Sequence, residues 1–432
     1  MKLSHLSVKE YLLSERTEKY FSISEKAAHM KILEISIAYL LQFDESVLTK
    51  ARLKSSPLAQ YAARHWINHA KFEEIDPAPL KLILQLFTPE SAAFINWIWI
   101  HDINNIYPCQ DLSRRRGQVQ SPLYYASLAG LQQVTTLLLE NGADVNVQGG
   151  NYGNALQAAS SGGHEAIVKL LLEKGADMNV QGAKYGNPLR AASLKGHEAI
   201  VKLLIEKGAN VNQQRGESSN ALLVASERGY EMIVKLLIEK GADVNAEGGY
   251  GNALLAASLE GHEAIVKLLI EKGADVNSEG QYGNALQVAS SGGHEAIVKL
   301  LIEMGVDVNA FNGIALQAAS SNGHEAIVKL LLENGADVNA QEGIYGNALQ
   351  AASFRGHEVI VKLLIEKGAD VNAQGGEYGN ALQVASSEGH EAIVQLLIEK
   401  GADVNAHGGQ YGNCYKLFFY ILRIYGQTLT YS

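Results

Sequence analysis

The chain has 432 residues, of which 47% are hydrophobic and 7% aromatic, so it can bury sizeable cores and is not a disordered polymer. Its formal charge is −10, and the acidic excess lies after residue 117: residues 1–117 carry 15 Lys and Arg against 13 Asp and Glu, whereas the remainder carries 21 against 33. This charge argues against nucleic acid and anionic membrane as partners of the C-terminal two-thirds.

Cysteines and apolar stretches indicate the compartment. Cys109 and Cys414 are too far apart in sequence to suggest a disulfide framework or a metal site, and favour a reducing compartment. The N-terminus lacks the apolar core of a secretory signal. The apolar stretches 94–106 and 417–425 are interrupted by charge or too short to span a bilayer. We therefore expect a soluble cytoplasmic protein, with the nucleus as an alternative, that makes no membrane contact.

The first 117 residues show no internal repeat. Apolar periodicity predicts helices within Ala28–Phe43, Leu58–Phe72 and Leu80–Ile100, so we expect an irregular helical domain over residues 1–117. The basic run 114–116 is interpreted as a solvated linker to the rest of the chain.

From residue 118 the sequence repeats itself to residue 413, with nine units and the beginning of a tenth at Tyr411. The spacing between units is 33, 33, 33, 32, 32, 30, 33 and 33 residues, measured between the equivalent positions Leu131, His164, His197, Tyr230, His262, His294, His324, His357 and His390.

One unit, residues 152–177, shows the expected local structure. Asn154 is placed to cap a short first helix, and Gly162-Gly163 ends that helix. Glu165 begins a second helix, for which we expect a buried stripe at Ile167, Leu170 and Leu171. Gly175 ends it, so the unit is predicted to be helix, turn, helix, loop.

This unit resembles the ankyrin repeat, which has the same period and a similar Gly-Ala-Asp tract. The segment 154–157, Asn-Ala-Leu-Gln, stands where that family usually has Thr-Pro-Leu-His. The resemblance implies an all-α, elongated and curved solenoid in which each unit stacks on its neighbours. The 30-residue unit around Phe311, Asn312 and Gly313 lacks three loop residues and has Ile314 at the cap position, so we expect the least stable interface there.

The opening segment also carries a resemblance. Residues 3–14, Leu-Ser-His-Leu-Ser-Val-Lys-Glu-Tyr-Leu-Leu-Ser, with Ala27-Ala28-His29, resemble the segment that follows the NTPase module in fungal NACHT-type signalling proteins, which often continue into ankyrin repeats. This resemblance implies a sensing or recruiting arm of a signalling receptor. The alternative is a regulatory fragment of such an NTPase, because this sequence contains no phosphate-binding loop.

Three chemical interpretations are disfavoured. The seven histidines at the repeat markers are too far apart, on stacked helices, to hold one metal ion, and we interpret them as ties between neighbouring turns. The paired glycines in the loops lack a nucleotide-binding pattern. The serines equivalent to Ser160 recur with the helices and are interpreted as small packing residues. We expect no catalytic residue, no metal, no cofactor and no enzymatic activity.

Positions that vary between units are the candidates for partner recognition. In ankyrin-like proteins the loop tips and the first-helix face line a concave surface, so we expect a protein ligand there, with exposed aromatic and arginine side chains as anchors. Phe354 with Arg355 is the strongest pair. The full set of candidate contact residues is Leu194, Lys195, Arg215, Arg228, Glu260, Phe311, Phe354, Arg355 and Glu388.

The repeat pattern is lost in residues 414–432, an apolar tail that is either a substitute cap helix or translated sequence beyond a broken reading frame. We expect the isolated chain to be monomeric. If the tail is not a cap, its deletion leaves the cooperative melting of the repeats intact.

Overall fold

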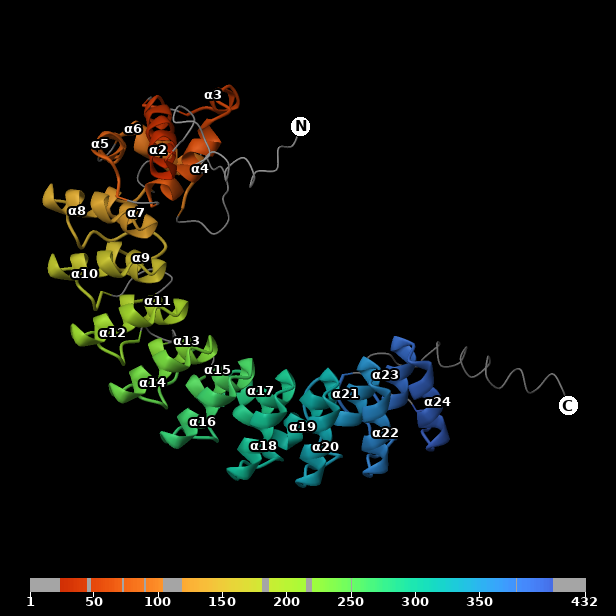
Figure 1. Ribbon diagram of the computed structural model, residues 1–432. Coiled ribbons are helices and arrows are strands. Elements are labelled where there is room, and N and C mark those ends of the chain that lie inside the picture. Colours follow the sequence, from red (N-terminus) through yellow and green to blue (C-terminus); the bar gives the residue numbers. More distant parts are fainter. Residues whose placement is uncertain are drawn as a thin grey trace, which may run out of the picture. The chain divides into compact units, whose positions relative to one another are not determined.

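The structure, a computed structural model, describes residues 24–44, 48–71, 74–88, 91–103, 119–180, 186–214, 220–249, 251–377 and 379–406. The opening segment 3–14, both cysteines, the basic run 114–116 and the tail 414–432 lie outside these residues. The chain divides into two compact units, Met1–Arg215 and Gly216–Ser432. Figure 1 shows the helices of both units.

The first unit begins with a group of helices that do not repeat. α2 and α4 cover most of the first two predicted stretches, whereas the third stretch contains two helices rather than one. The first of these, α5, ends at Leu86, and the second, α6, begins at Ala92. The helices are α2 (Glu25–Leu41), α3 (Lys50–Lys54), α4 (Ala59–Ala70), α5 (Pro77–Leu86) and α6 (Ala92–Ile100).

An aromatic cluster centred on Trp97 holds this group together. The Trp97 ring is fully buried and contacts Trp66, Phe87, Phe94 and Tyr125, with ring centroids 5.2, 5.6, 5.8 and 6.1 Å away. Its Nε1 donates a hydrogen bond of 3.0 Å to the buried main-chain carbonyl of residue 63. Because Tyr125 belongs to the first repeat, the hydrophobic core of the helical group continues into the repeats.

A representative repeat consists of α9 (Ala155–Gly162) and α10 (Glu165–Glu173). The Asn154 side chain accepts a 2.9 Å hydrogen bond from the backbone N–H of Gln157, so the predicted N-cap is confirmed. Gly163 has a φ of +76°, the left-handed conformation that ends a helix at low cost for glycine. The buried stripe differs in one position from the prediction: Val168 is fully buried, whereas Leu170 is half-buried.

In the first unit three such helix pairs stack on one another, with first helices against first helices and second against second (Figure 1). The pairs are α7 (Pro122–Ala129) with α8 (Gln132–Glu140), α9 with α10, and α11 (Pro188–Lys195) with α12 (Glu198–Glu206).

The second unit repeats the same arrangement with six pairs, again in two layers. A two-residue antiparallel pair, β1 (Glu279–Gly280) with β2 (Gly283–Asn284), forms one loop hairpin. The helix pairs are α13 (Ala221–Glu227) with α14 (Glu231–Glu239), α15 (Ala253–Glu260) with α16 (Glu263–Glu271), α17 (Ala285–Gly292) with α18 (Glu295–Glu303), α19 (Ala310–Asn322) with α20 (Glu325–Glu333), α21 (Ala348–Arg355) with α22 (Glu358–Glu366), and α23 (Ala381–Glu388) with α24 (Glu391–Glu399). The predicted all-α repeat architecture is confirmed.

The marker histidines connect successive repeats. In each case Nε2 lies 2.9–3.1 Å from a main-chain carbonyl oxygen near the end of the preceding first helix, which confirms their interpretation as ties. The pairs, histidine first, are His164 with Leu128, His197 with Ser161, His262 with Glu227, His294 with Leu259, His324 with Ser291, His357 with Ser321 and His390 with Phe354.

Asparagines in the loops form a second series of ties, which the repeat pattern alone does not predict. Asn245 is an example: its Nδ2 donates to the Gly273 carbonyl at 3.1 Å, and its Oδ1 accepts from the Asp275 N–H at 2.8 Å. Asn146, Asn309, Asn339 and Asn372 make the same pair of bonds to the next loop. Each of these repeats is therefore fixed to the next at both ends of its helix pair.

The recurring serines are packing residues, as predicted. Ser160 and its equivalents are completely buried, except Ser386, which is 6% exposed. The Ser386 hydroxyl donates a 2.7 Å hydrogen bond to the Leu382 carbonyl. Such positions leave no nucleophile open to a substrate. The completely buried equivalents of Ser160 are Ser193, Ser226, Ser258, Ser290, Ser320 and Ser353.

The 30-residue repeat has a distinct loop. Phe311, Asn312 and Gly313 are consecutively left-handed, with φ of 55°, 52° and 71°, and they interrupt α19 near its start. A left-handed conformation costs a residue with a side chain roughly 1–2 kcal/mol. The Asn312 side chain donates a 2.7 Å hydrogen bond to the Glu342 carboxylate in the next loop. The shortened loop is thus strained but tied to its neighbour, and the lower stability of this interface stays a prediction.

The helical group of the first unit contains histidines that resist protonation. His29 Nδ1 and His69 Nδ1 are 3.0 Å apart, and burial, together with His29 and His65, lowers the pKa of His69. Burial, with Arg64 and His65, also lowers the pKa of His101, against the opposing effect of Asp102. A histidine with a lowered pKa in the folded state binds its proton more readily when unfolded. These histidines therefore reduce the stability of the unit as the pH falls below 6.5, the pKa of histidine in the unfolded chain.

We expect the first unit to melt at a lower temperature near pH 5 than near pH 7.5, by about 2–4 °C for each ~1 kcal/mol lost. The tryptophans of the chain, Trp66, Trp97 and Trp99, all lie in the helical group, so tryptophan fluorescence follows this unit. His69→Gln should reduce the difference between the two pH values. An equal pH dependence in the variant and the parent would show that His69 is not responsible.

Candidate functional site

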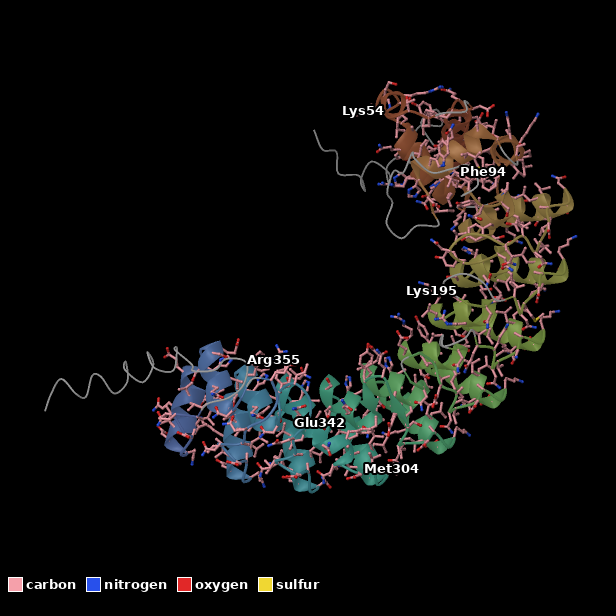
Figure 2. The ribbon with its side chains drawn as sticks, turned by 180° about the vertical axis from the view of Figure 1, so that it is seen from behind. Lys54, Phe94, Lys195, Met304, Glu342 and Arg355 are labelled. Carbon is pink, nitrogen blue, oxygen red and sulfur yellow. The ribbon has the colours of Figure 1, made fainter. Side chains whose placement is uncertain are left out.

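The ends of the first helices are where the predicted contact residues lie. In the first unit, at the end of α11, Lys195 is exposed and Leu194 is half-buried. In the second unit the exposed residues at these positions are Arg228, Glu260, Arg355 and Glu388, and Phe354 is half-buried. Figure 2 shows Arg355 on the side formed by the first helices and Met304 on the side of the second helices. Arg215 lies outside the described residues.

Phe354 and Arg355 belong to a small cluster with the loop residue Tyr345. The Arg355 guanidinium carbon lies 5.5 Å from the centre of the Phe354 ring, and Arg355 Nη2 donates a 3.2 Å hydrogen bond to the Tyr345 hydroxyl. The rings of Tyr345 and Phe354 have centroids 5.3 Å apart. Stacking of this kind restricts the side chains before any partner arrives, so the cluster presents an ordered surface at low entropic cost.

The other predicted residues lie in different surroundings. Arg228 forms an exposed ion pair of 3.3 Å with Glu227, and Glu388 accepts a 3.4 Å hydrogen bond from the Ser387 hydroxyl. Phe311 is 40% exposed at the left-handed loop. The structure therefore brings Phe354 together with Arg355, but it does not gather all candidates of the second unit at one point.

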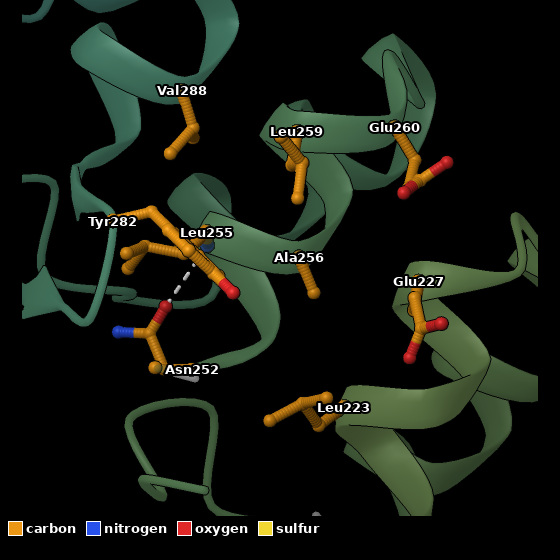
Figure 3. A pocket seen from close by; sticks show the side chains of 10 residues that line it. Leu223, Glu227, Asn252, Leu255, Ala256, Leu259, Glu260, Tyr282 and Val288 are labelled. Atoms are coloured by element: carbon orange, nitrogen blue, oxygen red, sulfur yellow. Dashed lines mark hydrogen bonds between the residues drawn. The ribbon is translucent and has the colours of Figure 1, made fainter. Parts of the chain in front are cut away.

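A pocket of about 200 Å³ opens on the first-helix side of the second unit, next to Glu260. Its walls come from α13, α15, α17 and the hairpin before α17. Figure 3 shows the Glu227 and Glu260 carboxylates at one side of the pocket and Tyr282 and Val288 at the other. The lining side chains are mostly apolar and comprise Leu223, Glu227, Asn252, Leu255, Ala256, Leu259, Glu260, Tyr282 and Val288.

A second, wider hollow of about 740 Å³ adjoins the first and shares Leu259, Tyr282 and Val288 with it. It continues past α17 to Phe311 and Glu342. We call the two hollows together the α15 groove. Its exposed apolar side chains are large: Leu259, Tyr282 and Phe311 have exposed fractions of 41%, 54% and 40%.

The apolar floor of the α15 groove arises from a substitution within the repeats. At the third helical position of the first helix, five of the nine repeats have a glutamine, and in four of them its side chain donates a hydrogen bond to the next loop. Gln317 Nε2, for example, donates to the Glu342 carbonyl at 2.8 Å, and Gln383 Nε2 donates to the Ala406 carbonyl at 3.0 Å. The repeats of α13 and α15 have Leu223 and Leu255 there instead. Comparison of the repeats at this position could have revealed the change, which the variable helix ends and loop tips do not indicate.

Two findings concern metal ions and membranes, and both apply to the described residues. In this part of the chain no group of three or more His, Cys, Asp or Glu is placed to hold a metal ion. Among the same residues, no helix is long and apolar enough to cross a membrane.

Stacked helix pairs with glycine-ended helices and protruding loops define a solenoid repeat protein. A family model described as ankyrin repeats matches residues 100–182, 123–215, 156–248, 189–280, 253–342 and 316–407. These matches together span more than half of the chain, so the protein belongs to the ankyrin-repeat family. Ankyrin repeats are in general protein-interaction modules.

The chain is also similar to a curated protein and to a solved structure. The chain is 39% identical over 171 residues to the azaphilone pigments biosynthesis cluster protein L of Monascus ruber. The matched region covers 36% of this chain and 36% of that protein. The chain thus matches about a third of the length of this relative. It is also similar to the crystal structure of the human ASB11 ankyrin repeat domain, with 27% identity, coverage of 50% of this chain and 99% of that one, and a TM-score of 0.46.

Proposed function

We propose that this chain is a non-enzymatic scaffold that binds a protein ligand through the first-helix ends and loops of its repeats. One observation carries the proposal. The positions that stack, such as Ser160, keep the same buried residue from repeat to repeat, whereas the neighbouring positions at the helix ends change and stay open to solvent. Stacking does not account for side chains such as Lys195 and Arg355, so they are available for a partner.

The Phe354–Arg355 cluster is the first place to test. Aromatic and arginine side chains dominate the energy of protein interfaces, and these two are held in position by Tyr345. The variant Phe354→Ala with Arg355→Glu should lose the partner. Val359→Ala is a matched control, because Val359 is 56% exposed on α22, the second helix of the same repeat.

The experiment compares the proteins retained from a cell extract by the parent chain and by the two variants, with quantitative mass spectrometry. A retained protein is then purified and its affinity measured directly. We expect a ligand that binds the parent and the Val359→Ala variant but binds the double variant at least about tenfold more weakly. Equal binding to all three proteins, or no specific ligand, would argue against the proposal.

We further propose that this scaffold is the sensing or recruiting arm of a signalling receptor of the NACHT type. The support is the resemblance of residues 3–14 and 27–29 to the segment that follows the NTPase module in such proteins. The alternative is a regulatory fragment of such an NTPase, which requires either that translation starts upstream or that a separate NTPase chain binds residues 1–117.

Sequencing the complete transcript tests this second step. An in-frame phosphate-binding loop upstream of Met1 would support the receptor-arm proposal. If translation begins at Met1, the search turns to an NTPase chain that binds residues 1–117, and failure to find one would leave the scaffold function without the NACHT connection.

A further inference from the structure

The α15 groove indicates which kind of partner segment the second unit binds. This inference rests on the proposed scaffold function. Leu223 and Leu255 stand where four other repeats have a glutamine that donates a hydrogen bond to the next loop. Each replacement gives up a tie between repeats, so it is not favoured by stacking alone. The two leucines are 6% and 4% exposed and line the walls of the open pocket.

The size of the pocket fits one large apolar side chain. An apolar cavity of about 150 Å³ is enough to hold a benzene molecule, and the pocket here is about 200 Å³. Its neighbour in the α15 groove is larger and shallower, and exposes Tyr282 and Phe311. Apolar side chains gathered around an open hollow are typical of a surface that binds another molecule.

The charges at the groove select among possible partners. Glu227, Glu260 and Glu342 line the two hollows, and no Lys, Arg or His is among the described residues that line them. The Arg228 guanidinium offsets the charge of Glu227 only in part, because this ion pair is exposed and therefore weak. A phosphate-bearing ligand would be repelled here, whereas lysine or arginine next to an apolar side chain would be attracted.

We propose that the α15 groove binds a linear segment of a protein partner in which a phenylalanine or leucine enters the pocket and lysine or arginine residues flank it. The apolar side chain lies against Leu223, Leu255 and Leu259. The basic residues lie beside Glu227 and Glu260, and the rest of the segment follows the wider hollow toward Phe311 and Glu342. The partner is thus a basic, apolar-anchored peptide rather than an acidic one.

A random linear-peptide library displayed on phage, selected on the full chain, supplies the probes. We expect the enriched peptides to carry an aromatic or leucine residue flanked by Lys or Arg. The affinity of their synthetic forms should decrease as the salt concentration rises, since the carboxylates are exposed to solvent. Peptides without this pattern, or no enrichment, would overturn the proposal.

Leu255→Gln is the sharpest variant. Glutamine occupies the equivalent position in the next repeat, as Gln287, and in four others, so the variant should fold as stably as the parent while its affinity for the selected peptides falls at least about tenfold. The double variant Glu227→Gln with Glu260→Gln should bind the basic peptides more weakly than the parent does. Its affinity for them should also depend less on the salt concentration. Val359→Gln, on α22, is the matched control and should leave binding unchanged. If Leu255→Gln binds the peptides as well as the parent does, the groove is not their site.

Analytical ultracentrifugation tests whether the groove instead binds a second copy of this chain. Self-association of the chain that is lost in Leu255→Gln would show that the groove binds a second copy and would overturn the peptide proposal. The scaffold function fails separately, because it requires a ligand lost on changing Phe354 and Arg355. A protein ligand that depends on those two residues but not on Leu255 would leave the scaffold function standing and refute the assignment of the groove.

Discussion

Replacing Trp97 with alanine should destabilise the first unit by about 3–5 kcal/mol, because the change removes a fully buried indole and leaves a cavity. Trp97 contacts rings from α4, α6 and the start of the repeats. We therefore expect the loss to reach α7, the first repeat helix, and to appear there as reduced protection of amide hydrogens from exchange.

Trp97→Phe is the control for this experiment. Phenylalanine keeps an aromatic ring in the cluster but loses the hydrogen bond to the carbonyl of residue 63, so the expected cost is intermediate, about 1–3 kcal/mol. Denaturation followed by circular dichroism measures both variants. Unchanged exchange in α7 of Trp97→Ala would show that the helical group and the repeats do not share a core energetically.

Replacing Gly261 with alanine should cost the second unit about 2–4 kcal/mol, more than the same change at Gly273. Both glycines are left-handed, with φ of +79° and +89°, so each variant bears a conformational penalty of about 1–2 kcal/mol. At Gly261 the new Cβ would also lie 2.5 Å from the His294 ring, whereas at Gly273 nothing lies within 4 Å.

The difference between the two variants isolates the tie between repeats. If the Cβ displaces His294, its bond to the Leu259 carbonyl is lost, which is worth about 1 kcal/mol or more. Thermal melting of Gly261→Ala, Gly273→Ala and His294→Ala provides the comparison. Equal destabilisation by the two glycine variants would mean that the histidine moves aside without cost.

The repeats could be predicted because their determinants are local. The Asn154 cap, the glycine after the first helix and the apolar spacing of the second helix each act within a few residues. The helices of the non-repeating group were predicted less fully, because α3 and the division between α5 and α6 were not expected. Packing around Trp97, rather than a repeated pattern, determines that region.

The candidate site could be predicted only in part. Variation between repeats correctly indicated that Lys195, Arg228 and Arg355 would be exposed. It could not indicate which side chains meet, because the contact of Phe354 with Tyr345 depends on how a loop folds back onto the helix end. The left-handed Phe311 and Asn312 were likewise hidden, since residues with side chains rarely adopt that conformation.

The histidine and asparagine ties of the second unit each reach only one repeat along the chain. A pulling force applied along the stack would therefore pass through the interfaces between repeats in series, and within each interface the ties and the packed helices would share the load. A repeat that gives way would release about 33 residues, or roughly 110–120 Å of extended chain, without loosening the repeats beyond its immediate neighbours. Under tension the second unit would thus lengthen in discrete steps and act as a reversible molecular spring.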